Sequence, residues 1–210
     1  MPGKVIAIEG IDGAGTTTQA ELVFRKLLEK RIPAHLVREP SDGPVGCLLR
    51  QILKRRLVVP GRTAAHPPGA VTMGLLFAAD RCDLLEAEVR PNLDEGSLVV
   101  SDRSVFSSLA YQSIGGADLN WLFEVNRFAC WPDLTIILDT DPGVAARRRA
   151  VRMQRPEIFE EDDMQRKLAA FYRGLPSMFP NHRFVLVDSD RSIEEVFHAC
   201  WRTVEDFLAE

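Results

Sequence analysis

Short apolar segments alternate with amphipathic segments along the whole chain, and this alternation predicts the order of strands and helices. Five apolar runs predict buried strands, and they cover residues 5–8, 34–38, 97–101, 134–139 and 183–187. Between them, hydrophobic positions recur at helical spacing and predict helices over residues 17–30, 45–56, 71–89, 105–113, 119–130, 143–152, 162–175 and 193–208. The stretch 58–70 is rich in proline and glycine and is expected to be a loop.

Strands and helices that alternate in this way form a parallel sheet with helices on both faces. The sequence contains no internal repeat or linker, so residues 1–210 are expected to form one α/β domain. The start of the last helix is marked by Ser192 and Glu195, which match the capping-box pattern. Ligands of such sheets bind beyond the carboxyl ends of the strands, so residues that directly follow a strand are the first site candidates.

Charge and composition exclude several classes of function. The chain has 26 basic and 30 acidic residues and a formal net charge of −4, so it lacks the field that attracts nucleic acid or anionic lipid. No apolar run reaches the ~18 residues of a membrane helix, and we expect neither a membrane span nor a signal peptide. The four cysteines form no C-x-x-C pair, which indicates reduced thiols in a cytoplasmic protein without a zinc site.

The segment after the first predicted strand matches the phosphate-loop pattern G-x-x-x-x-G-K-[ST] except at the lysine. Gly10 and Gly15 have the required spacing, and Thr17 occupies the hydroxyl position that serves magnesium. Glycines allow backbone N–H groups to turn inward around a phosphate at the positive end of a helix. An ordinary glycine turn is the alternative. The predicted ATP-binding residues are Gly10, Asp12, Gly13, Ala14, Gly15, Thr16, Thr17 and Thr18.

Thr16 stands where the lysine is expected, so the loop lacks a cation that usually contacts the outer phosphates. Lys4 lies about 20 Å away along the strand and cannot replace it. The densest positive patch is residues 147–155, where Arg148, Arg152 and Arg155 would share one helix face. A solvated basic face is the usual interpretation of such a run. The alternative is that one of these arginines supplies the missing charge.

Two acidic residues end apolar strands. Asp102 follows residues 98–101, a pattern that holds Mg²⁺ through water in phosphate-loop enzymes, and we expect Thr17 and Asp102 to form the metal site. Asp139 has the same local pattern and ranks lower, because it can equally start a helix. Arg103 follows Asp102 and could bind a phosphate through two N–H groups, or form a structural ion pair.

Four segments at strand ends and on the long helix share their order and spacing with one known family. They are Arg38-Glu39-Pro40, Phe77-Ala78-Ala79-Asp80-Arg81, Asp102-Arg103-Ser104 continued by Ser107-Ser108-Leu109-Ala110-Tyr111-Gln112, and Pro132-Asp133-Leu134-Thr135. Over nearly the whole chain they resemble the thymidylate kinase family. The resemblance implies a three-layer phosphate-loop kinase fold with a five-stranded parallel sheet and a short lid near residues 147–160. It also implies transfer of the γ-phosphoryl group of ATP to dTMP with Mg²⁺, and a homodimer.

Carried over by position, the resemblance implies roles for individual residues. Phe77 would stack on thymine and Arg81 would donate to the base. Arg103 and Arg38 would hold the dTMP phosphate, with Asp12 near the acceptor sugar. The nucleoside pocket would include Ser108, Tyr111 and Gln112, and the lid would supply Arg148 or Arg152 to catalysis. For the pair on the long helix, the alternative is a core phenylalanine beside an arginine that is paired with Asp80 or Glu86.

The sequence departs from the family at several positions. Thr16 replaces the loop lysine, Ser41-Asp42-Gly43 replaces Gly-Gly-Thr, Ser104 replaces a tyrosine, and Phe159 stands where some members carry a hydroxylated aromatic residue. Thr16 therefore leaves two other hypotheses open: a nucleotide-binding homologue with little turnover, and a kinase for another nucleotide.

Overall fold

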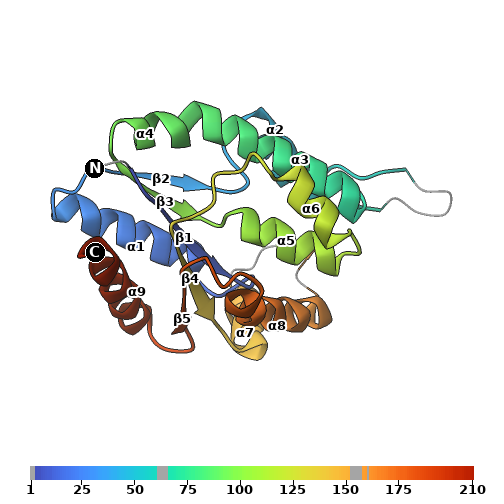
Figure 1. The fold of residues 1–210 in the computed structure, drawn as a ribbon. Coiled ribbons are helices and arrows are strands. Elements are labelled where there is room, and N and C mark those ends of the chain that lie inside the picture. Colours follow the sequence, from blue (N-terminus) through green and yellow to red (C-terminus); the bar gives the residue numbers. More distant parts are fainter. Residues whose placement is uncertain (1–2, 61–65, 152–157, 160) are drawn as a thin grey trace.

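The computed structural model describes residues 3–60, 66–151, 158–159 and 161–210. In these residues one parallel sheet contains five strands in the order β2-β3-β1-β4-β5 (Figure 1). The strands are β1 (Val5–Gly10), β2 (Ala34–Arg38), β3 (Leu98–Asp102), β4 (Leu134–Asp139) and β5 (Phe184–Asp188). The predicted α/β class and all five predicted strands are confirmed.

Helices follow the strands and cover both faces of the sheet. They are α1 (Thr16–Glu29), α2 (Pro44–Leu53), α3 (Ala70–Leu84), α4 (Arg90–Asp94), α5 (Val105–Ile114), α6 (Leu119–Val125), α7 (Pro142–Val151), α8 (Asp162–Met178) and α9 (Ile193–Leu208), with a π-helical turn η1 (Leu85–Val89) between α3 and α4. Helices α1 and α9 pack together against one face, while α3, α5 and α8 lie side by side on the other (Figure 1). Ser192 and Glu195 form the predicted capping box at the start of α9.

Three helix predictions were wrong at their ends. Residues 71–89 do not form one regular helix, because η1 widens it just before Pro91, whose ring would crowd the Ala87 carbonyl in an α-helix. Residues 119–130 are helical only to Val125, where the buried Asn126 side chain donates to the Leu122 carbonyl at 2.8 Å and competes with the helical pattern. Residues 45–56 are helical to Leu53, after which Arg55 adopts a φ of 56°.

The sheet register brings the loops that follow β1, β2 and β3 together at the carboxyl ends of these strands. Asp102, the last residue of β3, is paired with Ile8 of β1 on one side and with Arg38 of β2 on the other. The later strands β3 and β4 flank β1, so the chain leaves β1 at the point where the strand order reverses. A ligand crevice is expected at such a point. None of the helices in the described part of the chain is long and apolar enough to cross a membrane.

Candidate active site

The loop between β1 and α1 has the backbone geometry of a phosphate loop. Gly13 and Gly15 have φ angles of 93° and 100°, in the left-handed region that glycine enters without a steric cost. A Cβ atom on Gly13 would lie 2.6 Å from the carbonyl oxygen of Ala145 in α7, so the close approach of this helix also requires glycine. Gly15 directly precedes α1. Its position leaves the first N–H groups of the helix for an anion.

The predicted metal residues lie together at the carboxyl end of β3. Thr17 Oγ1 donates to Asp102 Oδ2 at 2.6 Å. The other carboxylate oxygen, Asp102 Oδ1, is buried and accepts no hydrogen bond from the described residues. A buried oxygen without a partner is costly, and a divalent cation or its water would satisfy it. These two residues therefore fit a Mg²⁺ ion whose other ligands are waters and phosphate oxygens.

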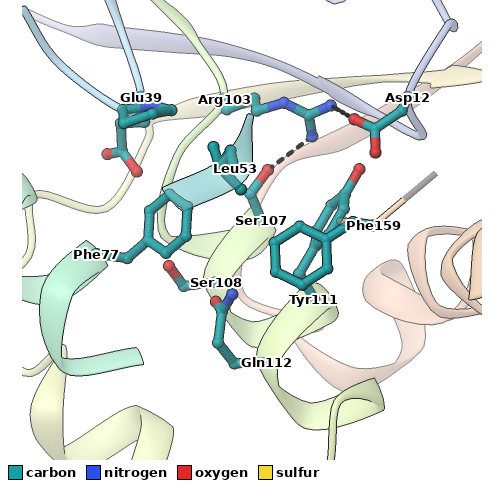
Figure 2. A pocket seen from close by; sticks show the side chains of 11 residues that line it. Asp12, Glu39, Leu53, Phe77, Arg103, Ser107, Ser108, Tyr111, Gln112 and Phe159 are labelled. Carbon is teal, nitrogen blue, oxygen red and sulfur yellow. Dashed lines mark hydrogen bonds and ion pairs between the residues drawn. The ribbon is translucent and has the colours of Figure 1, made fainter. Parts of the chain in front are cut away.

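A cavity of about 110 Å³ opens beside the phosphate loop (Figure 2). It is lined by Asp12, Glu39, Pro40, Leu53, Phe77, Arg103, Ser107, Ser108, Tyr111, Gln112 and Phe159. The structure thus brings together Asp12, Phe77, Arg103, Ser108, Tyr111 and Gln112, all of which the sequence suggested for an acceptor pocket. The rings of Phe159 and Tyr111 meet edge to face, with their centroids 5.3 Å apart. Phe159 therefore lies at the cavity as well.

Arg103 joins the cavity to the phosphate loop. Its Nη2 donates to Asp12 Oδ1 at 2.7 Å and its Nη1 to Ser107 Oγ at 3.1 Å (Figure 2). The same Nη1 also donates to the Gly10 carbonyl at 3.1 Å. Its φ of 75° is uncommon for a residue with a side chain. These contacts leave the Nε proton and one Nη2 proton without an acceptor among the described residues. The guanidinium can therefore still bind a phosphate.

Arg81 is paired within the chain, but not with either of the two acidic residues that the sequence offered as partners. Arg81 is 5% exposed, and its Nε donates to Glu39 Oε1 at 2.9 Å while its Nη2 donates to Ser108 Oγ at 2.8 Å. Its Nη1 bonds the buried side chain of Asn126. The partner is thus Glu39, a residue distant in sequence, and not Asp80 or Glu86. Arg81 lies behind the cavity and holds two lining residues, Glu39 and Ser108, in place.

Arg38 lies apart from the acceptor cavity. Its guanidinium forms an ion pair with Asp42 at 2.7 Å, and its side chain is 57% exposed. Together with Thr17 and Asp102 it lines a second cavity of about 180 Å³ behind the metal residues. The structure therefore does not place Arg38 beside Arg103, as two clamps on one phosphate would require.

One arginine of α7 packs directly on the phosphate loop. Arg149 Nη1 donates to the carbonyl oxygen of Asp12 at 2.6 Å, and the Arg149 side chain, which is 8% exposed, also pairs with Asp162 at 3.5 Å. The interpretation of this run as a solvated basic face is wrong for Arg149. Thr16, at the position of the absent lysine, is buried at the start of α1.

Arg148, the preceding residue of α7, also approaches the loop. Its Nη1 lies 3.5 Å from the Ala14 carbonyl oxygen, and its Nη2 donates to the carbonyls of Ser189 and Arg191 at 2.8 and 3.2 Å. These contacts tie the first part of the predicted lid to the loop after β5. The predictions for Arg152 and Arg155 lie outside the described residues.

Several residues of the site have a role that the sequence did not predict. Gln165 of α8 is completely buried; its Nε2 donates to Asp12 Oδ2 at 2.9 Å, and its Oε1 accepts the Asp12 N–H at 3.0 Å. The same Nε2 donates to the Phe159 carbonyl at 2.7 Å. Glu9 and Tyr172, both buried, form a second group with the half-buried Ser107 beside Arg103. No sequence signal predicts these contacts, although Ser107 belongs to one of the motifs, because the contacts depend on how α8 packs against β1 and α5.

A loop with phosphate-loop geometry at the carboxyl end of a parallel sheet, with a cavity on one side and arginines of α7 on the other, is typical of phosphate-loop kinases of the α/β class. Comparison with known proteins narrows this class. Residues 8–199 match the family model described as "Thymidylate kinase". The chain belongs to the thymidylate kinase family, as the sequence motifs predicted.

Individual relatives match over nearly their full length. A protein of Pyrococcus horikoshii named "Probable thymidylate kinase" is 40% identical over 196 residues, which cover 93% of each chain. A protein of the same name from Thermococcus gammatolerans is 38% identical over 197 residues and 92% of each chain. The "Thymidylate kinase" of Halothermothrix orenii is 32% identical over 216 residues and 99% of each chain.

Proposed function

We propose that the protein transfers the γ-phosphoryl group of ATP to dTMP and releases dTDP and ADP. The observation that carries this proposal is the ion pair of Arg103 with Asp12 at 2.7 Å, because it joins the acceptor cavity to the phosphate loop. Phosphoryl transfer requires in-line positioning and charge neutralisation more than covalent chemistry. An acceptor phosphate held by the free N–H groups of Arg103 would face the part of the phosphate loop that would hold the γ-phosphate of ATP.

The far end of the cavity fits a thymine base. Gln112 is 2% exposed, and its Oε1 is buried without a hydrogen-bond partner in the described residues. An amide oxygen accepts a hydrogen bond, which thymine and uracil can donate from N3 and cytosine cannot. Phe77 offers a ring for stacking at the same wall (Figure 2). In this proposal Arg81 does not donate a hydrogen bond to the base by itself. It holds Ser108 and Glu39, which line the cavity, in position for the base.

Mg²⁺ belongs to the proposal through Thr17 and Asp102. Bound between these side chains and the ATP phosphates, the metal would neutralise charge on the transferred group. The chain's own contribution is the orientation of the two ligands. The hydrogen bond of 2.6 Å between Thr17 and Asp102 fixes both oxygens before the metal binds.

The donor side must compensate for Thr16. We propose that lid arginines supply this charge, and the contacts of Arg149 with Asp12 and of Arg148 with Ala14 place two of them on the loop. Arg152 stays a candidate from the sequence. Arg149 is the strongest of the three, because its contact with the loop backbone, at 2.6 Å, is much shorter than the 3.5 Å contact of Arg148.

A second function, nucleotide binding with little turnover, is favoured by one observation. Thr16 has no side-chain nitrogen and its position is buried, so it cannot provide the ammonium group that the phosphate-loop pattern supplies. This hypothesis keeps the fold, the loop and the cavity, and differs in rate alone.

The proposal includes a homodimer in the cytoplasm. Leu48 of α2 and Val71 and Leu75 of α3 are 40%, 53% and 50% exposed, and apolar side chains on neighbouring helices support an interface between copies. The widely spaced cysteines, all free in the structure, support a reducing compartment. Sedimentation equilibrium of the wild type and of Leu75→Glu would test the interface, with a shift to monomer expected for the variant.

The decisive experiment is an ADP-release assay with ATP and Mg²⁺ against a panel of nucleoside monophosphates, with calorimetric binding of dTMP in parallel. Turnover of dTMP well above that of dCMP, dAMP and dGMP supports the proposed kinase. Binding of dTMP without turnover supports the second function. Preferred turnover of another nucleotide would overturn the substrate assignment.

A further inference from the structure

Glu9 is a completely buried carboxylate directly below the acceptor cavity, at the end of β1. Four hydrogen bonds reach it. Ser104 Oγ donates at 2.8 Å and Tyr172 Oη at 2.9 Å, while Ser107 donates both from its backbone N–H at 3.2 Å and from its hydroxyl at 2.7 Å. All four groups are donors, which is the arrangement that a carboxylate rather than a neutral amide requires.

The hydroxyl of Ser107 links Glu9 to Arg103. A serine hydroxyl has one proton, and that of Ser107 points to Glu9 Oε2. Its lone pairs are therefore directed away from Glu9, where one of them accepts Arg103 Nη1 at 3.1 Å. Glu9 thus sets which way Ser107 points. Ser107 in turn fixes the orientation of the Arg103 guanidinium at its Nη1 end. The backbone of Arg103 is held at a φ of 75°.

Tyr172 links the same carboxylate to α8. Its side chain is 2% exposed, and its hydroxyl lies 2.9 Å from Glu9 Oε2 and 3.0 Å from Ser107 Oγ. Two turns earlier on the same face of α8, Gln165 holds the carboxylate of Asp12. Helix α8 therefore supports both members of the Asp12–Arg103 ion pair, Asp12 directly and Arg103 through Glu9.

The electrostatics of Glu9 agree with a specialised role. Burial raises the pKa of Glu9 above its ordinary value, against the opposing effects of the Arg103 charge and of the hydrogen bonds from Ser107, Ser104 and Tyr172. A buried acid is expensive when its partners are removed. The enclosing donors also include Ser104, at one of the positions where this chain departs from its family.

We infer that Glu9 is a positioning residue for the acceptor phosphate: through Ser107 it fixes the guanidinium of Arg103, and through Tyr172 it couples that guanidinium to α8. This inference rests on the proposed function, because it assigns Arg103 to the acceptor phosphate. Glu9 itself does not touch the substrate, since Ser107 lies between it and the cavity.

The test compares Ser107→Ala and Glu9→Gln with the control Ser113→Ala. Ser113 lies on the same helix, and its hydroxyl bonds helical carbonyls instead of the Glu9 group. We expect Ser107→Ala to lower kcat/KM for dTMP about tenfold or more, with the KM for ATP unchanged and with weaker dTMP binding in calorimetry. Ser107→Thr, which keeps the hydroxyl, should restore most of the loss. In an Arg103→Lys background the effect of Ser107→Ala should shrink, because the fork that Ser107 orients is gone.

Ser107→Ala keeps the experiment informative if Glu9→Gln fails to fold. Equal losses of kcat/KM for dTMP and for ATP in Ser107→Ala, together with a lower Tm, would show a general structural role and overturn the inference. Full additivity of the effects of Ser107→Ala and Arg103→Lys on kcat/KM would also overturn it. The proposed function fails separately, when the wild type neither turns over nor binds dTMP. If the wild type binds dTMP without turnover, the change in dTMP Kd for Ser107→Ala still decides the question, and an unchanged Kd overturns the inference.

Discussion

The guanidinium of Arg103 lies 2.7 Å from the carboxylate of Asp12, although the two residues are 91 positions apart in the chain. One residue follows β3 and the other belongs to the loop after β1. Their ion pair forms because β1 and β3 are neighbours in the sheet and end at the same edge. It is 17% and 25% exposed at its two side chains, so the site remains open to an incoming phosphate.

Replacement of Arg103 by alanine is expected to lower kcat/KM for dTMP at least about a hundredfold, because a charge-assisted contact in a closed site contributes ~3 kcal/mol or more and each 1.4 kcal/mol is a factor of ten. The KM for ATP should change little. Steady-state kinetics with each substrate varied in turn measures both values. Arg103→Lys keeps the charge without the planar fork, so its kcat/KM for dTMP should lie between those of the wild type and Arg103→Ala. A near-normal kcat/KM for dTMP in Arg103→Ala would remove this residue from acceptor binding.

Arg149→Ala is expected to lower kcat by up to about a thousandfold, because an arginine that neutralises charge in the transition state can contribute this much. Thr16→Lys should then recover part of the loss, since two cations that serve one charge are not additive. The matched control is Arg147→Ala, an exposed arginine of the same helix. A kcat of Arg149→Ala equal to that of the wild type would show that Arg149 does not act in catalysis and has a structural role only. Activity that appears only on addition of Thr16→Lys would favour the binding protein with little turnover.

Arg81→Ala is expected to destabilise the fold by about 3–5 kcal/mol, because it leaves the carboxylate of Glu39 buried without its partner. Glu39 and Arg81 are 8% and 5% exposed at their side chains, so little water reaches either group when its partner is removed. Urea unfolding of Arg81→Ala, Glu39→Ala and the double variant measures the coupling, and the double variant should lose less than the sum. Unchanged stability combined with lost dTMP binding would instead make Arg81 a free donor to the base.

Thr17→Ala is expected to raise the Mg²⁺ concentration required for half-maximal activity at least about ten- to a hundredfold, because it removes a ligand oxygen together with the hydrogen bond that orients Asp102. Thr17→Ser keeps the hydroxyl that bonds Asp102 and should remain close to the wild type. Titration of activity with Mg²⁺ at fixed ATP distinguishes the two. An unchanged Mg²⁺ requirement in Thr17→Ala would contradict the assigned metal site.

The cysteines should differ sharply in reactivity. Burial raises the pKa of Cys200 to about 12, so its thiol stays protonated at neutral pH and is closed to reagents. Cys47 is exposed. Mass spectrometry after brief treatment with iodoacetamide at pH 8 should find Cys47 modified and Cys200 unmodified, and urea should make Cys200 reactive. Rapid modification of Cys200 in the native protein would show that α9 opens locally.

Local sequence determined the strands, the phosphate loop and the family of this protein. Short apolar runs rich in β-branched residues between amphipathic segments favour buried strands, and the spacing of Gly10 and Gly15 indicates the backbone path of a phosphate loop. Phe77, Tyr111 and Gln112 were found because each belongs to a motif with a fixed spacing. Such features depend on neighbours within a few residues, which is the range in which sequence patterns act.

Tertiary structure decided which charged groups pair and which remain free for a ligand. The sequence offered Asp80 or Glu86 as the partner of Arg81, whereas in the folded chain Glu39 reaches it from the loop after β2. Arg149 was one of several equivalent arginines until the close approach of α7 to Gly13 brought it to the Asp12 carbonyl. Glu9, Ser107 and Tyr172 have no common pattern in the sequence. A buried polar group takes its partners from whatever elements pack around it, and the order of the strands and the packing of α8 determine those elements.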